Sequence, residues 1–72
     1  MLGKVTGVGF IRVDRGVRTR LRVSDKAGHE YSLDIEATSK ISVGAEVRWN
    51  DKTLTAPAVS DKLFQVHKIH KE

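Results

Sequence analysis

Apolar and polar residues alternate along most of this chain with the two-residue period of half-buried β-strands. The clearest run is residues 17–23, where Val17, Leu21 and Val23 share one face and three arginines share the other. The same alternation recurs along the chain and predicts strands at residues 4–13, 17–23, 29–36, 41–49 and 63–69. β-Branched residues dominate the expected inner faces, as strands favour.

The alternation also predicts which side chains are buried. In the first strand we expect an inward face of Val5, Gly7, Gly9, Ile11 and Val13, with the glycines allowing a sharp bend. The outward face then holds Lys4, Thr6, Val8, Phe10 and Arg12. Trp49 is expected to be partly buried at the end of the fourth strand. The other expected core residues are Val17, Leu21, Val23, Leu33, Ile35, Val43 and Val47.

The turn between the first two strands sets their register. A two-residue loop of Arg15 and Gly16 would place apolar side chains opposite charged ones. A three-residue loop, Asp14-Arg15-Gly16, pairs Val13 with Val17 and puts glycine third, where such loops favour a left-handed residue. We therefore expect the three-residue loop. The outer face of the hairpin would then carry Arg12 opposite Arg18, Phe10 opposite Arg20, and Val8 opposite Arg22.

Three segments are less regular. Residues 37–41 have room for at most one short helical turn, and residues 54–59 are ambiguous because Pro57 excludes a central strand there. In the last run, Ser60 could cap a short helix, but the apolar residues favour a closing fifth strand. The prediction is an all-β fold: one domain over residues 1–72, a single five-stranded antiparallel barrel.

The order of these segments resembles the OB-fold and its five-stranded relatives. A bent Gly-Lys-Val strand opens the chain, and a Val-Ser-Asp-Lys-Ala-Gly turn joins the second and third strands. The run Ile41-Ser-Val-Gly-Ala-Glu-Val47 is similar to the step before the fourth strand of S1-like RNA-binding domains and translation initiation factor one. The same step occurs in SH3-like barrels, the alternative fold, and in oxyanion-binding TOBE modules.

The residue types present exclude several kinds of functional site. The 72 residues include no cysteine, so neither a disulfide nor a thiolate metal site is expected. His67 and His70 would point to opposite faces of a strand, and no carboxylate cluster completes a metal site. Ser24 and Ser60 have no histidine at a catalytic spacing, so we expect no enzyme, no catalytic residue and no cofactor. No run is long and apolar enough for a membrane span, and the expected location is cytoplasmic.

Positive charge is concentrated at the start of the chain. The net charge is +5 over residues 1–27, −3 over residues 28–51 and +2 over residues 52–72. Five of the six arginines fall within eleven residues: Arg12, Arg15, Arg18, Arg20 and Arg22. The planar guanidinium suits phosphate, which makes this cluster the main candidate site.

Two interpretations of the arginine cluster are possible: a ligand-binding surface, or a set of ion pairs with the neighbouring strand. In one, these arginines and Phe10 form a platform on the first two strands, with Lys4 and Lys26 as peripheral phosphate contacts. In the other, the third strand supplies carboxylates. If Val23 pairs with Tyr31, Arg20 faces Asp34 and Arg18 faces Glu36; a tighter register puts Arg18 opposite Asp34 and Arg22 opposite Glu30.

The first reading predicts binding of single-stranded DNA or RNA with little sequence preference. Because the acidic third strand would repel phosphate, the nucleic acid should lie over the first two strands and the Arg15 turn. The alternative is a small adaptor or homo-oligomer that covers the Val8 and Phe10 face with a protein partner. A third hypothesis is a TOBE-like oligomer that binds a small oxyanion.

Overall fold

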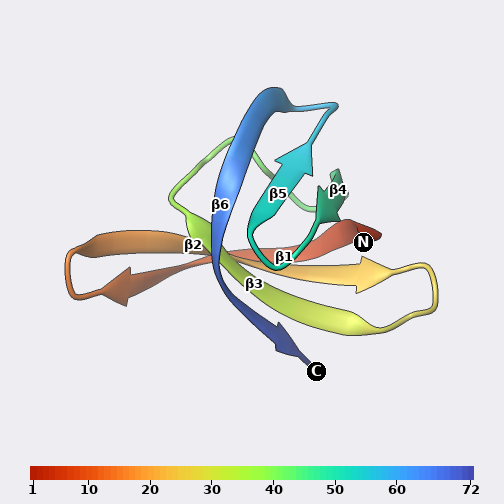
Figure 1. Cartoon of the computed structure of the whole chain (residues 1–72), viewed down its shortest axis with the longest axis horizontal. Coiled ribbons are helices and arrows are strands. Elements are labelled where there is room, and N and C mark those ends of the chain that lie inside the picture. The colour runs from red at the N-terminus through yellow and green to blue at the C-terminus, as the bar shows by residue number, and fades with distance from the viewer.

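The computed structural model describes all 72 residues as a closed barrel of antiparallel strands (Figure 1). This confirms the predicted all-β barrel, with six strands in place of five. The additional strand forms because residues 53–56 pair before Pro57, which lies in the following turn. The strands are β1 (Leu2–Val13), β2 (Gly16–Asp25), β3 (Glu30–Glu36), β4 (Glu46–Trp49), β5 (Thr53–Ala56) and β6 (Ser60–Lys71).

The strands follow one another around the barrel in the order β1-β2-β3-β6-β5-β4, and β4 returns to β1. The last apolar run is a strand, as expected, and not a helix. The link over residues 37–45 contains no helical turn. It is tied to β2 through Thr19, whose buried hydroxyl accepts a hydrogen bond from the Thr38 N–H at 2.9 Å and donates to the Thr38 carbonyl.

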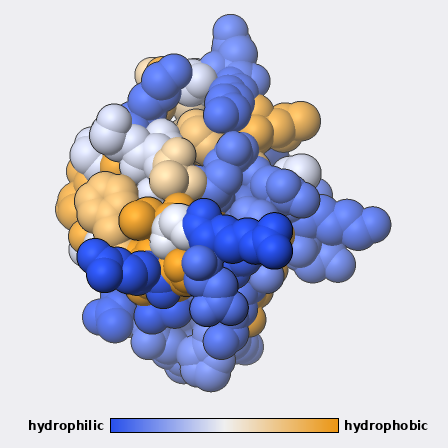
Figure 2. Space-filling view, turned by 90° about the vertical axis from the view of Figure 1, so that its left-hand side faces the viewer, coloured by the Kyte–Doolittle hydropathy of each residue, from blue (hydrophilic) through white to orange (hydrophobic).

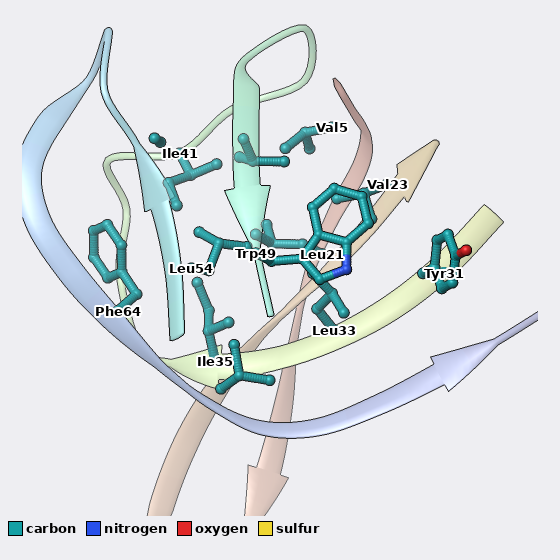
Figure 3. Close-up of a cluster of buried hydrophobic side chains, with 13 residues drawn as sticks. Val5, Leu21, Val23, Tyr31, Leu33, Ile35, Ile41, Trp49, Leu54 and Phe64 are labelled. Carbon is teal, nitrogen blue, oxygen red and sulfur yellow. The ribbon is translucent and has the colours of Figure 1, made fainter. Parts of the chain in front are cut away.

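Thirteen buried hydrophobic side chains form the core, and Figure 3 shows them converging from all sides of the barrel. Trp49 is almost completely buried and meets Tyr31 edge to face, with ring centroids 5.6 Å apart. Two expected core residues are exposed instead. Val17 lies on the β1–β2 hairpin arm beyond the barrel wall, and Val43 lies in the link before β4.

The register predicted for the first hairpin is wrong by one residue. Val13 pairs with Gly16 across a two-residue loop, so Phe10 faces Thr19 and Arg12 faces Val17. Gly16 adopts the positive φ expected of it, 145°, but as the first residue of β2 and not as the third residue of the loop. Because a one-residue slip reverses the faces of a strand, Phe10 and Arg12 lie on the face opposite the arginines of β2.

A β-bulge at Thr6 explains this slip. Val5 pairs with Val23 and Gly7 pairs with Arg22, which leaves Thr6 as the extra residue between them. The bulge allows Val5 to enter the core while Val8, three residues later, also packs against it. Four residues expected on the inner face therefore lie on the outer one: Gly7, Gly9, Ile11 and Val13.

Of the two registers considered for β2 and β3, the structure has the one that pairs Val23 with Tyr31. The turn between these strands is organised by Asp25, whose carboxylate accepts hydrogen bonds from the N–H groups of Ala27 and His29 at 2.9 Å. Burial raises the pKa of Asp25, but the hydrogen bonds and charge of His29 and the Ala27 N–H outweigh it, so the net shift is downward.

Candidate nucleic-acid interface

The outer face of β2 carries Arg18, Arg20 and Arg22 in a row, opposite β3 on one side. On the β1 side this row faces Ile11, Gly9 and Gly7. The predicted platform of arginines with Phe10 therefore does not form on this face. The arginines themselves are brought together as the alternation predicts.

Arg20 is held by a carboxylate. Its Nε lies 2.7 Å from Oδ1 of Asp34, and its Nη2 donates to Oδ2 at 3.1 Å. The Asp34 side chain is only 5% exposed, whereas that of Arg20 is 47% exposed. This two-pronged geometry is the strong form of an arginine–carboxylate pair. The cross-strand reading is therefore correct for Arg20.

Arg22 also faces a carboxylate, but more loosely. Its Nε lies 3.5 Å from Oε2 of Glu72, and the two side chains are 56% and 36% exposed. Such surface pairs contribute about 0–1 kcal/mol. Arg20 and Arg22 are thus partly neutralised, while Arg18 has no carboxylate within ion-pair distance.

The Arg20–Asp34 pair gives a pH-dependent prediction. The hydrogen bond from Arg20 holds the pKa of Asp34 below its usual range, although burial opposes the shift. A carboxyl with a lowered folded-state pKa adds stability above its unfolded pKa of about 3.9, and that stability is lost as the pH falls through the folded value.

We therefore expect Arg20→Ala to lower the urea midpoint at pH 7 several times more than Arg18→Ala does, because it leaves a buried carboxylate unpaired. The gap between Arg20→Ala and the wild type should close in acid, where Asp34 is protonated. Urea titrations monitored by Trp49 fluorescence measure both effects. Equal losses at pH 7 would show that the pair adds no stability.

The tip of the β1–β2 hairpin is a different environment. Arg12, Arg15 and Arg18 line one surface hollow there, together with His67 of β6. None of the three arginines has a carboxylate within 4.0 Å. Two acids border the hollow, Asp14 and Glu36. Glu36 is already engaged, because it lies 3.5 Å from Lys62 Nζ and accepts a hydrogen bond from the Gln65 N–H.

Apolar surface accompanies these charges. Phe10 is 62% exposed and Val17 is 49% exposed, although both lie on the same face of the hairpin as the core residue Leu21. They are exposed because the arm extends past the barrel (Figure 1). Figure 2, which looks onto this end of the molecule, shows apolar surface beside strongly hydrophilic side chains. Phe10 borders a separate hollow, whose lining includes Arg20 and Arg22, and it lies two residues before Arg12 on the same face of β1. An exposed aromatic ring is the kind of group on which a base can stack.

The two peripheral lysines lie elsewhere. Lys4 and Lys26 border a hollow at the other end of the hairpin, next to Asp25 and Glu46. Eight residues of strand separate Lys4 from Arg12, or about 26 Å. The structure therefore divides the predicted site into three parts. Arg12, Arg15 and Arg18 line the hollow at the tip, Phe10 borders a second hollow with the paired Arg20 and Arg22, and the two lysines are distant from both.

Two residues at the tip were not expected from the sequence to belong to the site. Val17 was assigned to the core because it continues the alternation of β2. His67 was considered only as a metal ligand. It lines the same hollow as Arg18 at a bulge in β6, where Lys68 pairs with Asp34 and Val66 pairs with Ile35. No local sequence signal marks that bulge.

No group of three or more histidine or acidic side chains is placed to hold a metal ion. The chain contains no helix that is long and apolar enough to cross a membrane. No protein-family model, curated protein or solved structure matches this sequence.

Proposed function

We propose that this protein binds single-stranded DNA or RNA, with little sequence preference, through the tip of the β1–β2 hairpin. The observation that carries the proposal is the pairing state of the arginines. Arg12, Arg15 and Arg18 have no ion-pair partner and share one hollow, although Arg18 pairs in register with Glu36. Arg20 and Arg22 lie within ion-pair distance of carboxylates. A cytoplasmic location is part of the proposal.

The chemistry of the tip supports a nucleic-acid ligand. Guanidinium groups bind phosphate oxygens in two-pronged fashion, and the exposed ring of Phe10 offers a surface on which a base can stack. Neither contact reads the edge of a base, which is why little sequence preference is expected. The protruding arm also keeps the ligand away from the carboxylates Asp34 and Glu72 on the outer face.

Fluorescence polarisation with labelled oligothymidylate and oligouridylate of roughly 12 nucleotides tests this proposal. Three neutralised phosphates predict that log K falls with log salt at a slope of about −2. Affinity should therefore drop about 20-fold between roughly 50 and 200 mM salt. The absence of binding at the lower salt concentration would refute the proposed function.

Phe10→Ala should weaken binding by roughly 5- to 150-fold, the range set by the loss of about 1–3 kcal/mol of stacking per base. The salt slope should stay the same, because removing a ring releases no counterions. Leu63→Ala provides a matched control, since Leu63 is equally exposed on a different part of the barrel. Equal losses in both variants would contradict a specific role for Phe10.

A further inference from the structure

The barrel leaves two stretches of strand edge without a neighbour. β1 pairs with β4 only over its first residues, so residues 7–13 have β2 on one side and nothing on the other. β6 pairs with β5 only up to Val66, so residues 67–71 are bordered by β3 alone. Alternate N–H and C=O groups along both edges therefore point to solvent.

The two edges differ in how they are protected. Residues 67–71 read His-Lys-Ile-His-Lys, and charged or polar side chains of this kind discourage pairing with another chain. Residues 7–11 read Gly-Val-Gly-Phe-Ile, with no charge and no proline. An apolar, open edge is normally avoided in a protein that stays alone. The β1 edge is therefore suited to receive a strand.

Gly9 has no structural reason to be glycine in the isolated chain. Its φ is not positive, and a Cβ added there would meet no atom within 4 Å. A glycine inside a strand costs stability relative to a larger residue. The missing side chain leaves space on the outer face of β1, directly beside the bulky side chain of Ile11.

We propose that the open edge of β1 pairs with the same edge of a second copy of this chain, antiparallel and with two-fold symmetry about Phe10. In this register Ile11 of each copy faces Gly9 of the other, and Val13 faces Gly7. The large residues of one edge thus occupy the spaces left by the glycines of its partner. This self-complementarity identifies a second copy, and not an unrelated peptide, as the occupant.

The proposed register does not bring like charges together across the two strands. Arg12 is the one charged residue on the free edge, and it would face Val8 of the second copy, so the two Arg12 side chains do not oppose each other. The two Phe10 rings meet at the centre, where aromatic pairs across strands are favourable. The inference does not rest on nucleic-acid binding, but the two proposals share Phe10 and Arg12, so a base stacked on Phe10 and a second copy paired at Phe10 would compete for the same ring.

Light scattering coupled to gel filtration, at increasing protein concentration, gives the first test. We expect a mass of twice the 8.0 kDa of the chain. Ile11→Lys, which places a charge on the edge, and Gly9→Val, which fills the space facing Ile11, should each return the mass to 8.0 kDa. Neither residue belongs to the core cluster, so thermal melting should show both variants folded.

Leu63→Lys is the control, since Leu63 is exposed but lies on the part of β6 that pairs with β5. This variant should keep the doubled mass. A wild type that stays at 8.0 kDa at every concentration would overturn the proposal. A dimer dissociated by Leu63→Lys and unaffected by Ile11→Lys would also overturn it.

The absence of native cysteine allows a direct test of the register. Facing residues of antiparallel strands have Cα atoms about 4.5–5.5 Å apart, within the range of a disulfide. Phe10→Cys should therefore form a covalent dimer under mild oxidation with a copper catalyst. Val13→Cys should not, because its two copies would lie about 20 Å apart. Equal cross-linking of both variants would refute the two-fold register.

Discussion

Trp49→Ala should lose about 3–5 kcal/mol of unfolding free energy, the usual cost of removing a buried large aromatic side chain. Trp49 is 3% exposed, contacts Tyr31 edge to face, and packs so closely on β1 that a Cβ at Gly3 would lie 3.0 Å from the indole. A domain of 72 residues has about 4–11 kcal/mol in total. Much of the variant is therefore expected to be unfolded in water.

Urea unfolding followed by circular dichroism measures this loss without relying on tryptophan fluorescence. Phe10→Ala is the matched comparison, because it also removes an aromatic ring but from an exposed position. It should change stability by less than about 0.5 kcal/mol. A Trp49→Ala loss below about 1 kcal/mol would place Trp49 outside the core.

The second large effect concerns binding. Replacing Arg12, Arg15 and Arg18 together with alanine should weaken oligonucleotide binding about 100-fold at roughly 0.1 M salt, because three phosphate contacts and their counterion release are lost. Stability should change little, since none of the three arginines is in an ion pair. Fluorescence polarisation and thermal melting on the same samples separate the two quantities.

A matched variant replaces Arg48, Lys52 and Lys71, which are exposed on other parts of the barrel. It removes the same charge and should keep most of the affinity. Equal weakening by both triple variants would mean that binding follows net charge and not the hairpin tip.

The alternation of apolar and polar residues in β2 and β3 was enough to predict which face of each strand points into the core. Leu21 and Val23 are buried and Arg20 and Arg22 exposed, because neither strand is interrupted and only one face can enter the core. β1 was different. Its apolar residues fall on both faces, with Val5 on one and Val8 and Phe10 on the other. A continuous strand cannot bury Val5 and Val8 together, and the Thr6 bulge resolves this conflict.

The candidate site was predicted in composition but not in geometry. The run of arginines is evident from the sequence, yet which of them are neutralised depends on residues far along the chain. Asp34 reaches Arg20 across one strand pair, and Glu72 reaches Arg22 from the end of β6. The sequence left two registers open, and only the three-dimensional pairing decides between them.

In the proposed interface, the unpaired arginines of the tip bind phosphate and the paired arginines of the outer face do not. The most direct test compares the salt dependence of oligonucleotide binding in two double variants, Arg12→Ala with Arg15→Ala and Arg20→Ala with Arg22→Ala. The first should make the slope of log K against log salt shallower by about 1.4, since each lost phosphate contact removes about 0.7. The second should leave the slope unchanged. A slope that becomes shallower only in the Arg20 and Arg22 variant would show that the outer face, and not the tip, binds phosphate.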